Sequence, residues 1–312
     1  MRESGTLNFQ WVTRETPTAS GDIPWRDLAA MTGERMGRHD VACPLCGPSR
    51  KAPANRVRKV LRVWIKEPGF ASYTCSQCGA HGWARDRDTR RIDPATFDRL
   101  RKEAETADNA ERTKRHDLAL FLWKRARPIA GTIAETYLRG RGIVCDLPST
   151  LRFLPTSRPD RHPAMIAAFG PASETAPGRV EIRDDAVTGV HLTLLRPDGS
   201  GKADVDPNKL MIGRSLGSPI VLAAPNDLLA LALIEGIEDA LSLHQGTGIG
   251  AWAAGAAGRF PALAEAVPSF LDLVHVGADD DEAGEAGARS ALTILHHRGI
   301  PASRLVISGG RA

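Results

Sequence analysis

The sequence has no apolar run long enough to cross a lipid bilayer. Its longest such run, residues 228–234, is far shorter than the roughly 20 apolar residues that a spanning helix needs. The first residues, MRESGTLNFQW, contain no apolar core of a secretory signal. These two absences favour a cytoplasmic protein that does not contact a membrane.

Cysteine is also scarce, with five among 312 residues. In a cytoplasmic protein, cysteines indicate metal or thiol chemistry rather than disulfides. The chain also lacks internal repeats, low-complexity tracts and the G-x-x-x-x-G-K-[ST] motif of nucleotide hydrolases. Its length and its hydrophobic content of 42% are sufficient for two or three packed domains.

Charge is unevenly distributed, although the net charge is only +4. Residues 1–140 carry an excess of Lys and Arg, whereas residues 141–312 carry an excess of Asp and Glu. A basic first part indicates nucleic-acid binding, and an acidic second part indicates metal binding. Charge scattered over solvated helices is the alternative interpretation.

Composition and periodicity predict five segments. The segments are an N-terminal extension (1–35), a zinc ribbon (36–92), a helical linker of one or two helices (93–128), a mixed, basic, β-rich subdomain (129–225) and a regular α/β domain (226–312). Within them we expect short helices at 23–31 and 133–139, and strands at 60–65, 165–169, 189–195 and 219–223.

The last segment predicts a parallel sheet of four strands. Apolar runs at 228–234, 250–254, 271–278 and 304–308 alternate with helical patterns at 237–245, 261–267 and 283–297. This alternation is typical of βαβ units with right-handed crossovers. The fold class is therefore a multidomain combination of α/β and α+β parts.

Four of the cysteines form two C-x-x-C pairs, Cys43 with Cys46 and Cys75 with Cys78. Two such pairs provide the four thiolates of a closed tetrahedral zinc site, which is structural because no coordination position stays open. His39 and His81 flank the pairs and are predicted to lie outside the ligand set, as is Cys145. Redox-active or buried free thiols are the alternative.

The segment between the two pairs is basic and contains aromatic residues. Arg56, Arg58, Lys59 and Arg62 precede Trp64, and no acidic residue occurs between Cys46 and Glu67. Cations bind phosphates and aromatic faces stack on unpaired bases, so this segment is a candidate surface for single-stranded DNA. Some of the aromatic residues are expected to form the ribbon's own core instead.

Two acidic motifs follow predicted strands of the last segment. The first spans Glu235 to Asp239 with the sequence E-G-I-E-D, and the second, D-D-D-E-A-G, begins at Asp279. The carboxyl ends of parallel strands meet at one sheet edge, where such folds carry their sites. Converging carboxylates repel one another unless a counter-ion is present, and Mg²⁺ or Mn²⁺ suits carboxylate oxygens. Solvated acidic loops are the alternative.

The two motifs in this order resemble a Toprim domain over roughly residues 226–310. The resemblance assigns Glu235 to the family's glutamate after the first strand, Asp279 and Asp281 to its D-x-D pair, and Asp239 to the acid four residues beyond the glutamate. It implies that Asp279 and Asp281 ligate Mg²⁺ or Mn²⁺, that Glu235 ligates or acts as a general base, and that Asp239 is a further ligand. We expect Glu238 and Glu282 to be helix-start acids.

A zinc ribbon, a basic subdomain and a Toprim domain, in this order, resemble DNA primases of the bacterial type. The runs T-Y-L-R-G-R-G-I at 136–143 and G-V-H-L-T at 189–193 are similar to primases of phages and mobile elements. The resemblance implies synthesis of short RNA primers on single-stranded DNA from ribonucleoside triphosphates. Cations of the middle subdomain would hold template or triphosphate, namely Arg139, Arg141, Arg196, Lys202, Lys209 and Arg214.

Two other functions fit the same motifs. A non-catalytic DNA-binding module similar to recombination mediators also combines four cysteines with a Toprim fold, and a Toprim nuclease shares the acidic residues. A topoisomerase is disfavoured because the only tyrosines, Tyr73 and Tyr137, lie in the ribbon and in a short helix. Because the sequence ends soon after the fourth predicted strand and has no hydrolase motif, we expect a replicative helicase on a separate chain.

Overall fold

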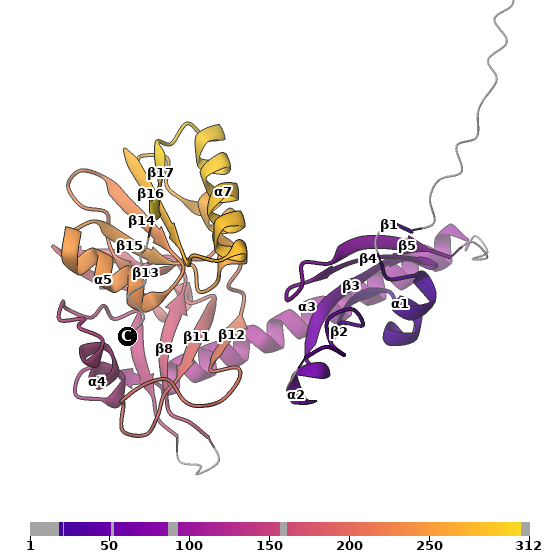
Figure 1. Cartoon of the computed structure of the whole chain (residues 1–312), viewed down its shortest axis with the longest axis horizontal. Helices are drawn as coiled ribbons and strands as arrows, with labels where there is room; N and C mark the ends of the chain where they lie inside the picture. The colour runs from indigo at the N-terminus through magenta and orange to yellow at the C-terminus, as the bar shows by residue number, and fades with distance from the viewer. Residues whose placement is uncertain (1–18, 21, 51–52, 87–92, 157–160, 307–312) are drawn as a thin grey trace, which may run out of the picture. The chain divides into compact units, whose positions relative to one another are not determined.

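A computed structural model of the chain describes residues 19–20, 22–50, 53–86, 93–156 and 161–306 (Figure 1). The chain divides into two compact units, residues 1–111 and 112–312, called here the N-terminal and C-terminal units. Within the described ranges, no helix combines the length and the apolar character that a membrane crossing requires.

The N-terminal unit contains a five-stranded antiparallel sheet. Its order is β1-β5-β4-β3-β2, with β1 at Ala19–Ser20, β2 at Gly37–Ala42, β3 at Lys59–Glu67, β4 at Phe70–Cys75 and β5 at His81–Arg85. Strand β3 alternates, so Leu61, Val63 and Ile65 are buried while the residues between them face outward. Two short helices accompany the sheet, α1 (Trp25–Thr32) and α2 (Pro53–Arg56).

Part of the predicted N-terminal extension belongs to the core of this sheet. Ile23 and Leu28 are buried together with Tyr73, whose hydroxyl accepts a hydrogen bond from the Ile23 backbone N–H at 3.1 Å. The predicted helix at 23–31 corresponds to α1, which begins after Pro24 and ends at a left-handed Gly33. Residues 1–18 lie outside the described residues.

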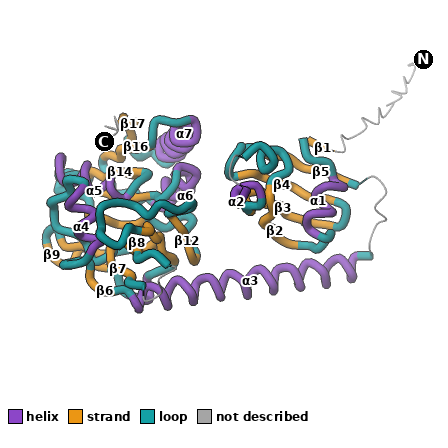
Figure 2. Tube along the Cα trace, turned by 60° about the horizontal axis from the view of Figure 1, so that its bottom comes forward, coloured by secondary structure: helices purple, strands orange, loops and turns teal. Residues whose placement is uncertain are grey.

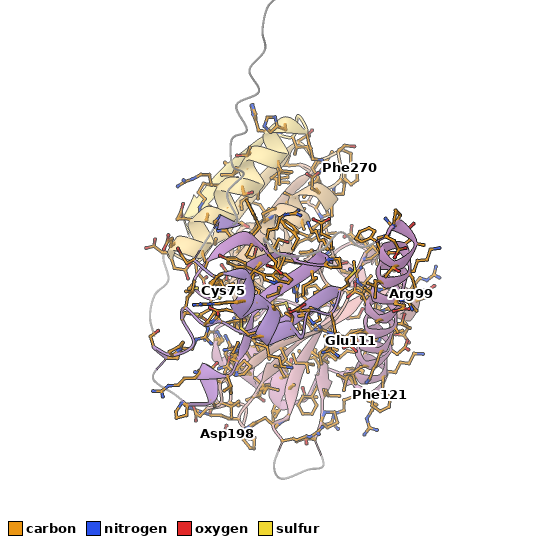
Figure 3. The ribbon with its side chains drawn as sticks, turned by 90° about the vertical axis from the view of Figure 1, so that its right-hand side faces the viewer. Cys75, Arg99, Glu111, Phe121, Asp198 and Phe270 are labelled. Atoms are coloured by element: carbon orange, nitrogen blue, oxygen red, sulfur yellow. The ribbon has the colours of Figure 1, made fainter. Side chains whose placement is uncertain are left out.

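The predicted linker is one helix, α3 (Pro94–Arg125), which is drawn along its length in Figure 2. Figure 3 shows the side chains of Arg99, Glu111 and Phe121 in order along it. In the N-terminal unit, Asp108 of α3 forms an ion pair with Arg38 at 2.9 Å. In the C-terminal unit, Trp123 near the end of α3 is fully buried.

The C-terminal unit begins with a second antiparallel sheet, the middle sheet. Its order is β12-β11-β8-β7-β6, with β6 at Arg127–Pro128, β7 at Leu151–Leu154, β8 at Ala164–Phe169, β11 at Gly189–Leu194 and β12 at Lys209–Gly213. Ala119 and Trp123 of α3 pack against one face of this sheet. Helix α4 (Ile133–Gly140) packs against the other face, and a hairpin of β9 (Ser173–Ala176) and β10 (Arg179–Glu181) precedes β11.

The C-terminal sheet has the order β13-β15-β14-β16-β17 (Figure 1). The strands are β13 (Ile220–Ala223), β14 (Ala230–Ile234), β15 (Gly250–Ala253), β16 (Leu273–Ala278) and β17 (Ala302–Val306). The last four are parallel to one another, as the alternation predicts. Helix α5 (Ile237–Thr247) packs on one face, and α6 (Phe260–Ala266) and α7 (Glu282–His297) pack on the other.

The C-terminal sheet differs from the prediction in having a fifth strand. Strand β13 pairs antiparallel with β15, whereas the sequence analysis placed residues 219–223 in the preceding subdomain. The short apolar run I-V-L-A is buried on both faces and has no alternation that would indicate its partner sheet. The four-strand parallel sheet is therefore the inner part of a mixed five-stranded sheet.

The strand order creates a switch point between β14 and β16. From β14 the chain moves to β15 on one side and later returns to β16 on the other. In open α/β sheets, ligands bind at the carboxyl ends of strands where the order reverses in this way. The loops after β14 and β16 carry the two acidic motifs.

Candidate functional site

The four cysteines of the N-terminal unit come together. Their sulfur atoms all lie within 4.8 Å of one another, and the Cys43–Cys78 and Cys46–Cys75 Sγ pairs are each 3.9 Å apart. Zinc–sulfur bonds of about 2.3 Å place the sulfurs of a tetrahedral site about 3.8 Å apart, and disulfides need about 2 Å. The cluster therefore fits a structural zinc ion.

Two glycines shape the metal knuckles. The Gly47 N–H donates to the Cys43 carbonyl at 2.9 Å, and the Gly79 N–H donates to the Cys75 carbonyl at 3.1 Å. A Cβ on Gly47 would lie 2.5 Å from the Cys43 oxygen, and Gly79 has a φ of +71°. Both positions therefore favour glycine. Cys145 lies in the other unit, and His39 and His81 bond to backbone carbonyls, outside the sulfur cluster.

Glu235 stands at the end of β14, at the switch point of the C-terminal sheet. Its backbone N–H donates to the Gly277 carbonyl of β16 at 3.1 Å, which ties the two strand ends together. Its Oε2 accepts from the Asp279 backbone N–H at 3.5 Å. The carboxyl group is half-buried, and burial together with the charge of Asp279 raises its pKa.

Asp279 and Asp281 lie on the exposed loop that follows β16. Asp281 caps α7, since its Oδ1 accepts from the Gly284 N–H at 2.7 Å. A Cβ on Gly284 would lie 2.2 Å from the Asp279 carbonyl oxygen, so the absence of a side chain at Gly284 lets the loop pass close to the helix. The position of Asp281 is thus fixed by its role as the N-cap of α7.

Asp239 lies in the first turn of α5, half-buried. Burial raises its pKa, and the charges of Glu238 and Asp279 raise it further. Within the described part of the chain, the four cysteines form the one group of three or more candidate ligands whose atoms lie close enough together to hold one metal ion. The carboxylates of Glu235, Asp239, Asp279 and Asp281 are therefore neighbours that have not converged to metal-ligand distances.

Glu238 is the main difference between the predicted and the observed arrangement. It does begin a helix, but it is only 5% exposed and its Oε1 accepts from the Tyr137 hydroxyl at 2.5 Å. The Lys202 Nζ lies 3.0 Å from the same oxygen. Although burial opposes ionisation, Lys202 and Tyr137 hold the pKa of Glu238 at about 2. The three side chains join α4, the loop before β12 and α5.

The other predicted cations of the C-terminal unit have different surroundings. Lys209 and Arg214 are exposed at the two ends of β12, and Arg141 is exposed after α4. Arg139 is bound within its own segment, since its guanidinium donates to Glu135 of α4 and to the Ile143 and Cys145 carbonyls. Arg139 thus closes the loop after α4.

The predicted nucleic-acid residues of the ribbon lie on and beside β3. Arg62 and Trp64 alternate with the buried residues and therefore face outward. They border a shallow cleft of about 260 Å³ together with Lys59 and Thr74. Arg62 makes a bidentate ion pair with Asp40 at 2.7 and 3.1 Å, which offsets part of its charge. Arg56 and Arg58 lie at the start of this segment, and the Arg56 Nε donates to the Arg50 carbonyl.

Sequence reasoning missed His191 and Arg259. His191 on β11 is 3% exposed, and burial and the nearby charge of Lys209 lower its pKa to about 4. Arg259 follows β15 in a loop rich in Gly and Ala, and burial lowers its pKa to about 10. The run around Arg259 has no periodicity, so nothing in the sequence indicates that this arginine lies near the ends of the strands.

Comparison with known proteins finds distant similarities. Residues 113–222 match a family described as a domain of unknown function, DUF7146. Comparison with curated proteins gives no match. A DNA primase domain from Pseudomonas aeruginosa is similar at 13% identity and a TM-score of 0.39, over 63% of this chain and 72% of that chain. The Aquifex aeolicus primase (zinc-binding and RNA polymerase domains) is similar at 15% identity and a TM-score of 0.41, over 93% and 78%.

Proposed function

We propose that this chain is a primase-like nucleotidyltransferase that makes short RNA primers on single-stranded DNA, with the C-terminal sheet as its Toprim domain. One observation carries the proposal: the strand order brings the Glu235 and Asp279 loops together at the switch point of a parallel sheet. Beside them, Glu238 holds Lys202, which comes from the loop before β12. Acidic groups and a cation at one sheet edge suit a substrate that carries phosphates and a metal.

Glu235, Asp239, Asp279 and Asp281 would hold Mg²⁺ or Mn²⁺. Their oxygen donors suit these cations, and burial together with neighbouring carboxylates raises the pKa of Glu235 and Asp239, which a bound cation would offset. Asp279 and Asp281 are exposed, so their side chains can turn without unpacking the core. When bound, such an ion neutralises charge on the reacting phosphate and activates the attacking 3′ hydroxyl.

The chain's own residues would bind and orient the substrates. Lys202 has a fixed position because Glu238 accepts one of its hydrogen bonds, and its remaining N–H groups can donate to phosphate oxygens. Lys209 and Arg141, both exposed in the same unit, would hold further phosphates of the triphosphate or template. Glu235, half-buried at the strand end, would ligate the metal or take the hydroxyl proton.

The ribbon would bind the single-stranded template. Trp64 provides a face for a base, and Lys59 at the start of β3 lines the same cleft. A structural zinc held by the four cysteines would keep β3 and β4 in register below this surface, since Cys75 ends β4. We further propose that a replicative helicase on a separate chain is a partner of this protein. We also propose that the chain is related to primases of phages or mobile elements.

A DNA-binding module without catalysis is the second candidate. The observation that favours it is that the carboxylates do not meet metal-ligand distances in the described part of the chain, whereas the cysteines do. In this case the ribbon cleft would bind DNA and the C-terminal sheet would serve as a scaffold. A Toprim nuclease would need the same acidic residues as a primase.

Primer synthesis by variants of the acidic loop tests the proposal. The assay incubates the full chain with circular single-stranded DNA, labelled ribonucleotides and Mg²⁺ or Mn²⁺, and measures short RNA products. Asp281→Asn keeps an oxygen that can cap α7, because asparagine is as good an N-cap as aspartate, but it removes a charge and a metal ligand. We expect the rate to fall roughly 10²- to 10³-fold.

Asp272→Asn is the matched control, since Asp272 is an exposed aspartate immediately before the opposite end of β16. It should synthesise primers at the wild-type rate. An unimpaired Asp281→Asn variant would overturn the assignment of the acidic residues. Wild-type protein that binds DNA but makes no product with either metal would favour the binding module, and cleavage of the circle would favour a nuclease.

A further inference from the structure

Arg259 is a half-buried cation without an acidic partner among the described residues. Its Nε donates to the Ala254 carbonyl at 2.8 Å, and its guanidinium lies over the Phe169 ring at 4.8 Å from the centroid. The Nη2 atom is buried and has no hydrogen-bond partner. A buried donor without a partner costs free energy, most of all on a charged group. The guanidinium stays protonated at neutral pH, because its pKa is about 10.

Two more buried polar atoms without a partner lie on β11, which pairs with the strand that ends at Phe169. His191 meets Phe169 edge to face with 6.5 Å between ring centroids, and its Nδ1 is buried without a partner. Thr193, two residues along β11 on the same face, also has a buried hydroxyl without a partner. The Phe169 ring therefore contacts both Arg259, which follows β15, and His191 of β11.

This cluster adjoins the acidic edge of the C-terminal sheet. The Gly255 N–H donates to the Glu235 carbonyl at 2.9 Å, and the preceding N–H of Ala254 donates to the Ile234 carbonyl at 2.8 Å. A Cβ on Gly255 would lie 3.3 Å from Phe169 and 3.4 Å from His191, so the loop passes directly against both rings. The backbone that places Glu235 thus also places Arg259.

Positive charge predominates on this side of the acids. Lys202, Lys209 and Arg259 all act on the buried imidazole of His191. In the described residues Lys202 is paired with Glu238, whereas no carboxylate lies within 4.0 Å of Lys209 or Arg259. An anion is the ligand that compensates this charge, and a phosphate matches the planar fork of arginine.

We propose that Arg259 binds a phosphate group of the substrate beside Glu235, donating from Nη2, with His191 and Thr193 as further hydrogen-bond partners. The identity of the substrate rests on the proposed function, whereas the phosphate site itself rests on the contacts of Arg259. The phosphate belongs either to a nucleoside triphosphate or to the backbone of a nucleic acid, and both present the same oxygen atoms.

The test measures two ligands on the full chain, in wild-type protein and in Arg259→Gln. ATP binding with Mg²⁺ is measured by titration calorimetry without template, and binding of a labelled oligothymidylate is measured by fluorescence anisotropy. Loss of a charge-assisted hydrogen bond should weaken binding of one ligand roughly tenfold to a hundredfold. Weaker ATP binding identifies a nucleotide phosphate, and weaker oligothymidylate binding identifies a backbone phosphate.

Arg289→Gln is the matched control, since Arg289 is an exposed arginine on α7. Thermal unfolding separates a binding role from a structural one. Removing a half-buried, unpaired charge should leave the free Arg259→Gln protein at least as stable as wild type, while the rise in melting temperature at a given concentration of the affected ligand should become smaller. A large loss of stability in the free protein with unchanged ligand affinities would show that Arg259 only packs against Phe169.

Unchanged affinity for both ligands, or a wild-type chain that binds neither, would overturn the phosphate site. The proposed function fails separately. If wild-type protein makes no primers but binds ATP in a manner that depends on Arg259, the phosphate site stands and only the polymerisation is wrong.

Discussion

At the scale of single residues, Glu238 shows how distant positions decide the role of a charge. Its place at the start of α5 is sufficient to explain an acidic residue there, because acids stabilise helix N-termini. The partners that make it a buried anion are Tyr137, 101 positions away, and Lys202 in a loop of the middle sheet region. No local pattern in the sequence indicates such a triad.

The Glu238–Lys202 pair should be strongly coupled. Glu238→Gln leaves the partly buried Lys202 without its counter-charge, so we expect the free energy of unfolding to fall by about 1–3 kcal/mol. Adding Lys202→Met should recover part of that loss, because the uncompensated charge is then gone. Urea unfolding of both single variants and the double variant gives the coupling energy, and strictly additive effects would contradict the pair.

His191 should make the C-terminal unit sensitive to acid. Burial and the nearby cations lower its pKa from 6.5 to about 4, so between these values the unfolded chain binds a proton that the folded chain does not. This contribution to stability is complete above pH 6.5 and is lost as the pH falls to 4. His191→Gln should remove up to about 3 kcal/mol of the pH dependence in that window.

Urea unfolding at a series of pH values measures this slope in His191→Gln and wild type. The acidic groups of both proteins are identical, so the difference between the curves isolates the imidazole. Parallel curves between pH 6.5 and pH 4 would show that His191 titrates normally in the folded protein.

At the scale of elements, the sequence predicts the four parallel strands of the C-terminal sheet and two strands of the middle sheet, β8 and β11, but neither β7 nor β12 nor the sheet to which β13 belongs. Runs such as residues 230–234 and 273–278 are short, apolar and followed by acidic turns, so the strands and the acidic edge follow from local pattern. The partner of β13 depends on tertiary packing, since Thr150 donates to the Val221 carbonyl and the Gly170 N–H donates to the Pro219 carbonyl. The zinc ligands follow from spacing alone, whereas Arg259 follows from no pattern.

Gly284 fixes the approach of the acidic loop to α7. Gly284→Ala adds a methyl group 2.2 Å from the Asp279 carbonyl oxygen, so the loop must move even though alanine favours helix. We expect lower stability and weaker Mn²⁺ binding. Gly246→Ala is the control, because Gly246 lies in α5 with open space around it, and it should gain about 0.5–1 kcal/mol.

Thermal unfolding and Mn²⁺ titration, followed by electron paramagnetic resonance, distinguish the two glycines. A Gly284→Ala variant that is as stable as Gly246→Ala and binds Mn²⁺ like wild type would show that the loop adapts without cost. The acidic loop would then have no fixed distance from the helix.

At the scale of the whole molecule, the two units have separate hydrophobic cores. The N-terminal core contains Leu61, Tyr73 and the cysteines, whereas the cores of the C-terminal unit lie on the faces of the middle and C-terminal sheets. The cluster of four cysteines lies entirely within the N-terminal unit. Zinc should therefore stabilise one unit alone.

Removing zinc with a chelator should unfold the ribbon and leave the C-terminal unit intact, because small ribbons depend on their metal for stability. Hydrogen exchange resolved by peptide measures this, with protection lost over residues 59–85 and kept over residues 230–278. Metal analysis should find one zinc per chain, unchanged in Cys145→Ser. Loss of protection in β14 and β16 on chelation would contradict separate stability.

Strand β13 limits where the chain can be cut into fragments and where its gene can be recombined. It lies along β15 and is anchored to the middle sheet, so a fragment that starts at residue 226 leaves one side of β15 with unpaired N–H and C=O groups. Such an edge invites pairing with other copies and aggregation. Gene recombination that moves the acidic sheet into another protein must therefore carry the middle sheet with it. A crossover in α3 near the boundary of the two units at residues 111 and 112 leaves both parts whole.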